Sequence, residues 1–183
     1  TVDHALSDHI DRLRAAGASI VASSDYMHAH QWLGETCRPS PALDAIPRPD
    51  WLPRLVREGA VKWFIFIEPG PHLAEDFTAR IVAAMLNHAD ARILHGDHDR
   101  LDNNGSRSNP IFKPIHWDQD SHLQANIIRG WVAVTADTLD TCASPNGSSA
   151  WEIFYDLTMR VTEPAPDDRI RHIPHVLAHV PVE

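Results

Sequence analysis

The sequence predicts an α/β fold built on a mainly parallel sheet flanked by helices. Strand-like and helix-like segments alternate along the chain, which is typical of a parallel sheet with crossover helices. The clearest strand, residues 61–70, is apolar on both faces, as expected for a strand buried between two layers. The chain has 183 residues, of which 43% are hydrophobic, enough for one domain with a substantial core.

The first third of the chain predicts little regular structure. Residues 4–17 carry apolar side chains at helical spacing and end at Gly17, which predicts a helix. Residues 18–23 indicate a short strand. An irregular excursion follows at about 25–60, where several prolines break helices and remove hydrogen-bond donors. We expect residues 1–183 to form a single domain that includes this excursion.

The remaining two thirds predict alternating elements. Hydrophobic periodicity distinguishes the helices from the strands, and Asn103-Asn104-Gly105 is a strong turn signal. After the strand at 61–70, we expect a helix at 76–87, a strand at 91–99, an extended segment at 109–118, a short helix at 122–128, a strand at 130–137, a helix at 151–163 and a strand at 169–180.

Charge and composition exclude several classes of function. The chain has 16 Lys and Arg against 25 Asp and Glu, a net charge of −9, which disfavours nucleic acid as a partner. No apolar run approaches the roughly 20 residues of a transmembrane segment. Cys37 and Cys142 form no CxxC pair, which favours two reduced thiols over a disulfide. With no secretory signal visible, we expect a cytoplasmic location, and the start at Thr1 leaves room for flanking domains in a longer chain.

Candidate site residues follow from the predicted sheet. Ligands of α/β sheets bind beyond the carboxyl ends of the strands, which points to Asp3, Glu68, residues 95–99 and His179. Each has a structural alternative. Glu68 can be a solvated loop acid, and residues 97–99 can form a charged surface turn. His172 and His175 fit ordinary packed or surface histidines.

Several blocks in order resemble family 2 glycosyltransferases with a GT-A fold, bacterial enzymes that move a sugar from a nucleotide donor. The blocks are Val2-Asp3-His4-Ala5-Leu6-Ser7-Asp8, Ile67-Glu68-Pro69-Gly70-Pro71, Gly96-Asp97-His98-Asp99, Phe112-Lys113-Pro114, Tyr155-Asp156-Leu157 and the segment 172–179. The first strand of that fold has no counterpart here. The second acid of the metal motif is replaced at Gly70-Pro71, and the register of the catalytic base falls on Ile153-Phe154.

The resemblance implies a glycosyltransferase-like domain for polysaccharide biosynthesis, with a nucleotide sugar as donor and a saccharide as acceptor. It implies that Asp3, Asp97 and Asp99 contact the nucleotide. Glu68 and His179 would hold Mg²⁺ or Mn²⁺, which neutralises the leaving diphosphate. Glu152 or Asp156 would substitute for the missing base. The alternative is a catalytically inactive module of the same ancestry, used for binding or assembly.

Overall fold

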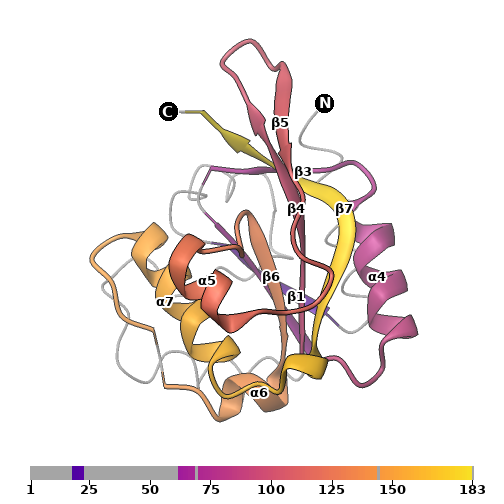
Figure 1. Cartoon of the computed structure of the whole chain (residues 1–183), viewed down its shortest axis with the longest axis vertical. Coiled ribbons are helices and arrows are strands. Elements are labelled where there is room, and N and C mark those ends of the chain that lie inside the picture. The colour runs from indigo at the N-terminus through magenta and orange to yellow at the C-terminus, as the bar shows by residue number, and fades with distance from the viewer. Residues whose placement is uncertain (1–17, 23–61, 69, 144, 183) are drawn as a thin grey trace, which may run out of the picture.

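The computed structural model describes residues 18–22, 62–68, 70–143 and 145–182, which form a sheet accompanied by short helices (Figure 1). The predicted helix at 4–17 and the excursion at about 25–60 lie outside the described residues. The elements are, in chain order, β1 (Ala18–Ala22), β2 (Trp63–Ile67), β3 (His72–Leu73), α4 (Phe77–Asn87), β4 (Ile93–Leu101), β5 (Arg107–Ile111), α5 (Gln119–Ala125), β6 (Trp131–Thr135), α6 (Ala136–Asp140), α7 (Ala150–Thr162), a 3₁₀ helix (Asp167–Arg169) and β7 (Ile170–Pro181).

The described sheet is mixed, so the expectation of a mainly parallel GT-A-like sheet flanked by helices is wrong. Its strand order is β1-β2-β6-β4-β7-β3, with β5 paired to β4. Only β1–β2 and β4–β7 are parallel; β6 runs antiparallel to both β2 and β4, and β3–β7 and β4–β5 are also antiparallel. The sheet curls into a half-barrel with few helices, and the β4–β5 hairpin projects from its upper end (Figure 1). An apolar sequence pattern predicts that a strand is buried, but it does not predict whether the strand runs parallel or antiparallel to its neighbours.

Most element positions match the sequence pattern. The strands expected at 18–23, 61–70, 91–99, 130–137 and 169–180 and the helices expected at 76–87 and 151–163 are confirmed, with ends that shift by a few residues. The short helix begins at Gln119 instead of residue 122, because the Asp118 side chain accepts a hydrogen bond from the Ser121 N–H and caps it. The extended segment expected at 109–118 forms a strand only at β5, Arg107–Ile111. Three short elements, β3, α6 and the 3₁₀ helix, were not predicted.

Two hydrophobic layers cover the two faces of the sheet. Alternate residues of β2 point to opposite faces, so Ile65 packs toward α4 whereas Phe64 packs toward α7. Phe77 of α4 meets Trp131 of β6 edge to face, with ring centroids 5.2 Å apart. Leu157 of α7 is fully buried in the other layer. None of the helices in the described ranges is long and apolar enough to cross a membrane.

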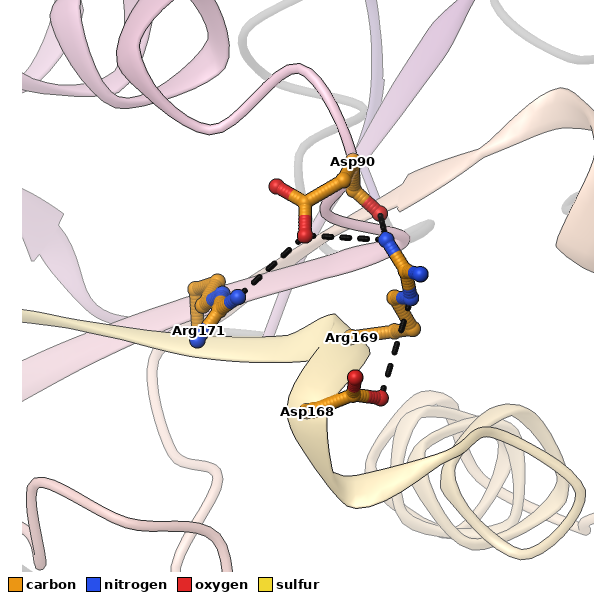
Figure 2. Close-up of polar contacts among 4 residues, drawn as sticks. All are labelled: Asp90, Asp168, Arg169 and Arg171. Carbon is orange, nitrogen blue, oxygen red and sulfur yellow. Dashed lines mark hydrogen bonds and ion pairs between the residues drawn. The ribbon is translucent and has the colours of Figure 1, made fainter.

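An exposed ion-pair network joins the turn before β4 to the start of β7 (Figure 2). The Asp90 carboxylate accepts hydrogen bonds from Arg169 at 2.9 Å and from Arg171 at 3.2 Å. Arg169 also lies 3.7 Å from Asp168. These side chains are more than a third exposed, so solvent screens the network and its contribution to stability is small. Asp90 is therefore a suitable exposed control for the stability contribution of a buried carboxylate.

Gly130 is required where β6 begins. Its φ of +83° lies in the left-handed region, and an added Cβ would stand 2.5 Å from the Ala178 Cβ of β7. We expect Gly130→Ala to lower the free energy of unfolding by about 2–4 kcal/mol, from backbone strain and overpacking together. Urea denaturation measures the loss. The matched control is Gly105→Ala, because Gly105 has a φ of +79° but nothing within 4 Å of an added Cβ. Equal losses in the two variants would contradict the expected clash.

Candidate functional site

Charged and histidine side chains gather where β2 and β4 end and β6 begins. They come from five separate segments of the chain, and nearly all of their side chains are buried or half-buried in the curl of the sheet. The members of this polar cluster are Glu68, Asp97, His98, Asp99, Lys113, Arg129, His172 and His179.

Glu68, at the end of β2, is 1% exposed and fully engaged. Its Oε1 accepts from Arg129 Nε at 2.9 Å and lies 2.8 Å from Arg129 Nη2. Its Oε2 accepts from Arg129 Nε at 3.0 Å and from the Gly130 N–H at 2.6 Å. Three N–H donors, with the Arg129 Nε–H shared between the two oxygens, therefore engage both oxygens of the Glu68 carboxylate.

Two aspartate–histidine pairs join β4 to β7. Asp97 Oδ1 lies 2.7 Å from His172 Nε2 and accepts a second hydrogen bond of 2.7 Å from the Lys113 N–H. Asp99 Oδ1 lies 2.6 Å from His179 Nδ1, while its Oδ2 accepts from Arg107 Nε at 2.8 Å. An ionised carboxylate can only accept, so each imidazole nitrogen donates. In a neutral imidazole that donates through Nδ1, the other nitrogen, Nε2 in His179, carries no proton and can accept one.

The Glu68–Arg129 pair lies close to the two aspartate–histidine pairs. Glu68 binds the Gly130 N–H, and Gly130 lies against Ala178, the neighbour of His179 in β7. The charges of Lys113 and Arg129 act on His98, whose pKa is lowered to about 4, mainly because burial disfavours the charged imidazole. The cluster is thus one continuous set of charges.

Lys113 is 8% exposed, and no ion pair joins its ammonium group to a carboxylate among the described residues. Burial lowers its pKa to about 8, against the opposing attraction of Asp97 and Glu68. Arg129 adds a further repulsion. A largely buried lysine that forms no ion pair with a described residue is costly, which makes Lys113 a functional candidate.

Beside the polar cluster, two histidines contact the buried Trp117, and His172 lies next to one of them. The Trp117 ring centroid lies 5.7 Å from that of His95 and 5.1 Å from that of His122, and His95 lies 5.3 Å from His172. Burial lowers the pKa of His95 to about 3 and that of His122 to about 4. Both ring nitrogens of His122 and the Nδ1 atoms of His95 and His172 are buried without a hydrogen-bond partner among the described residues. The lowered pKa values keep His95 and His122 neutral at pH 7.

The structure brings together four of the predicted site residues. Glu68, Asp97, Asp99 and His179 all belong to the polar cluster. For Glu68 the alternative of a solvated loop acid is wrong. For residues 97–99 the alternative of a surface turn is wrong, because they lie buried within β4. Asp3 lies outside the described residues.

Glu152 and Asp156 lie on α7 and are held by local contacts. Glu152 accepts hydrogen bonds of 2.6 Å from the N–H and hydroxyl of Ser148, which lower its pKa. Its own N–H donates to the hydroxyl of Ser149, the N-cap residue of α7. Asp156 accepts from Arg160 Nε at 2.6 Å and from the Asn146 N–H at 2.7 Å. No hydrogen bond or ion pair within the described ranges joins either carboxylate to the polar cluster.

The arrangement does not fit a divalent ion at Glu68 and His179. Arg129 and Gly130 engage both Glu68 oxygens, and a guanidinium at that position repels a cation. Asp99 engages only Nδ1 of His179, so Nε2 stays open and the misfit lies at Glu68. Across the part of the chain that the structure describes, no group of three or more His, Cys, Asp or Glu side chains has a metal-binding arrangement.

Sequence reasoning missed the cations of the cluster. Lys113 appears in the Phe-Lys-Pro block without a role, and Arg129 was not singled out. One signal was available: Lys62 and Lys113 are the only lysines of the chain, and Lys113 follows an apolar stretch. The pairing of Arg129 with Glu68, 61 residues earlier, had no comparable signal.

Comparison with known proteins adds no assignment: no family model matches the chain, and no curated protein matches it at a significant level.

Proposed function

We propose that this chain transfers a sugar from a nucleotide-diphosphate sugar to a saccharide acceptor at the polar cluster. One observation supports the proposal. Four of the blocks that carry the resemblance to glycosyltransferases, near residues 68, 97–99, 113 and 172–179, converge on one buried set of charges although they are widely separated in the chain. The mixed sheet does not count against it, because function depends on the site more than on the fold class.

The chemistry assigns His179 as the general base. The bond between the anomeric carbon and the phosphate oxygen breaks, and its electron pair leaves with the nucleoside diphosphate. The acceptor oxygen bonds to the anomeric carbon, and its proton passes to His179 Nε2. Asp99, hydrogen-bonded to Nδ1 at 2.6 Å, orients the ring and stabilises the imidazolium that forms.

The test incubates the purified chain with UDP-sugars and GDP-sugars and a saccharide acceptor, and measures release of the nucleoside diphosphate. We expect His179→Asn to slow release by about 10²–10⁴-fold, the usual contribution of a general base. His175→Asn is the matched control. His175 lies on the same strand but contacts Arg80 of α4, at 2.8 Å, outside the polar cluster. Full activity of His179→Asn would exclude this mechanism.

A second candidate function is a binding module without turnover. Its support is the engagement of Glu152 and Asp156 in local contacts of α7, which removes both residues that the resemblance offers as substitute bases. Calorimetric titration separates the two functions. Binding of UDP or GDP without any release from the corresponding sugar nucleotides would favour the binding module over the transferase.

A further inference from the structure

The polar cluster contains a cation that its own acids do not neutralise by direct contact. Both oxygens of Glu68 are engaged by Arg129 and Gly130, and Asp97 Oδ1 is shared by His172 and the Lys113 N–H. Lys113 nevertheless lies near both carboxylates and is only 8% exposed as a residue. Its three N–H donors have no hydrogen bond to a protein group among the described residues.

Arg129 supplies a second positive group with a free side. Its Nε and Nη2 atoms bind Glu68, whereas no contact of its Nη1 with a described residue is formed, and the side chain is 32% exposed. Lys113 and Arg129 lie on neighbouring parts of the sheet, because Arg129 binds Glu68 at the end of β2, the Lys113 N–H binds Asp97 of β4, and β6 pairs with both strands. Two adjacent cations with unused donors match the oxygens of a diphosphate.

We propose that the Lys113 ammonium and the outer edge of the Arg129 guanidinium bind the diphosphate of the nucleotide donor, in the place where a divalent metal is expected. This inference rests on the proposed function and deepens it. Glu68 then holds Arg129 in position instead of ligating a metal. The positioned cations stabilise negative charge on the leaving diphosphate.

The test is calorimetric titration of UDP and of inorganic pyrophosphate into the chain in the presence of EDTA. We expect binding without metal, and a Kd at least about tenfold weaker in Lys113→Met, which corresponds to about 1.4 kcal/mol. Lys113→Arg keeps the charge and is expected to restore most of the affinity. Lys62→Met is the matched control, because Lys62 is the only other lysine and is exposed. Circular dichroism and thermal melting establish that each variant is folded.

A second readout is independent of folding in the variants. Reductive methylation of the wild-type chain, followed by peptide mass mapping, reports the reactivity of the two lysines separately. We expect UDP to slow the methylation of Lys113 and to leave that of Lys62 unchanged. This protection would not arise if Lys113 only filled space in the core.

Binding that requires Mn²⁺, or wild-type affinity in Lys113→Met, would overturn the inference. Equal methylation of Lys113 with and without UDP would also overturn it. Failure of the proposed function looks different. In that case UDP binds in a Lys113-dependent way without metal, but no sugar nucleotide is consumed. Conversely, transfer that depends on Mn²⁺ and is unaffected in Lys113→Met retains the proposed function and removes the inference.

Discussion

Glu68→Gln is expected to lower the free energy of unfolding by about 3–5 kcal/mol, the usual cost of removing one partner from a buried ion pair. Glu68 is 1% exposed, and Arg129 and Gly130 occupy its acceptor positions. Glutamine keeps the size of the side chain but loses the charge and one acceptor oxygen. Its NH₂ group then faces donors, and the Arg129 guanidinium is left without a counter-charge. Urea denaturation at pH 7 measures the loss.

The comparison variant is Asp90→Asn. Asp90 also contacts two arginines, but in the exposed network of Figure 2. We expect its unfolding curve to overlay that of the wild type. A double variant, Glu68→Gln with Arg129→Gln, is expected to recover part of the loss, because the unpaired charge is gone. A loss below about 1 kcal/mol in Glu68→Gln would mean that water screens the pair as it screens an exposed one.

The sequence predicted where the chain forms strands and helices much better than how the strands pair. Residues 63–67 form a strand because every side chain there is apolar and both faces are covered, and this can be inferred from composition alone. The antiparallel direction of β6 between β2 and β4 depends on long-range contacts. No local pattern in residues 131–135 distinguishes the two directions, so the sheet was wrongly expected to be mainly parallel.

For the candidate site, the acids were easier to predict than their partners. Acidic residues at the ends of apolar strands are conspicuous, which is why Glu68, Asp97 and Asp99 were found. Their partners lie far away in the chain: His172 is 75 residues from Asp97. A register shift between β4 and β7, on both sides of Asp97, also alters the simple alternation of faces on which the sequence prediction relied.

The chain is expected to lose stability steeply as the pH falls from 6.5 toward 4. His95, His98 and His122 are buried and neutral in the folded protein, with pKa values lowered to about 3, about 4 and about 4. In the unfolded chain each takes up a proton near pH 6.5. Below that pH the unfolded state binds more protons than the folded state, so stability falls with pH until the folded pKa is reached.

The expected loss of unfolding free energy is large compared with the total stability of a domain. At pH 5 each of the three histidines lies about 1.5 pH units below its unfolded pKa, which costs about 2 kcal/mol per group and about 6 kcal/mol together. A domain of ordinary stability has about 5–15 kcal/mol in total. Urea denaturation at half-unit intervals between pH 5 and 6.5 measures the slope, and this window lies above the ordinary pKa of Asp and Glu, so carboxylates add little to it.

His122→Leu removes one of the three histidines that take up a proton on unfolding. Both ring nitrogens of His122 are buried without a partner beside Trp117, so leucine removes a polar group that makes no hydrogen bond and keeps a similar volume. We expect the slope of the free energy of unfolding against pH to fall by about 1.4 kcal/mol per pH unit, the equivalent of one proton.

The matched control is His88→Asn, at the exposed end of α4, which is expected to leave the slope unchanged. An unchanged slope in His122→Leu would mean that His122 is protonated in the folded chain. Its charge would then need an acid within reach, and Asp118, Asp120 and the polar cluster would be the places to search for one.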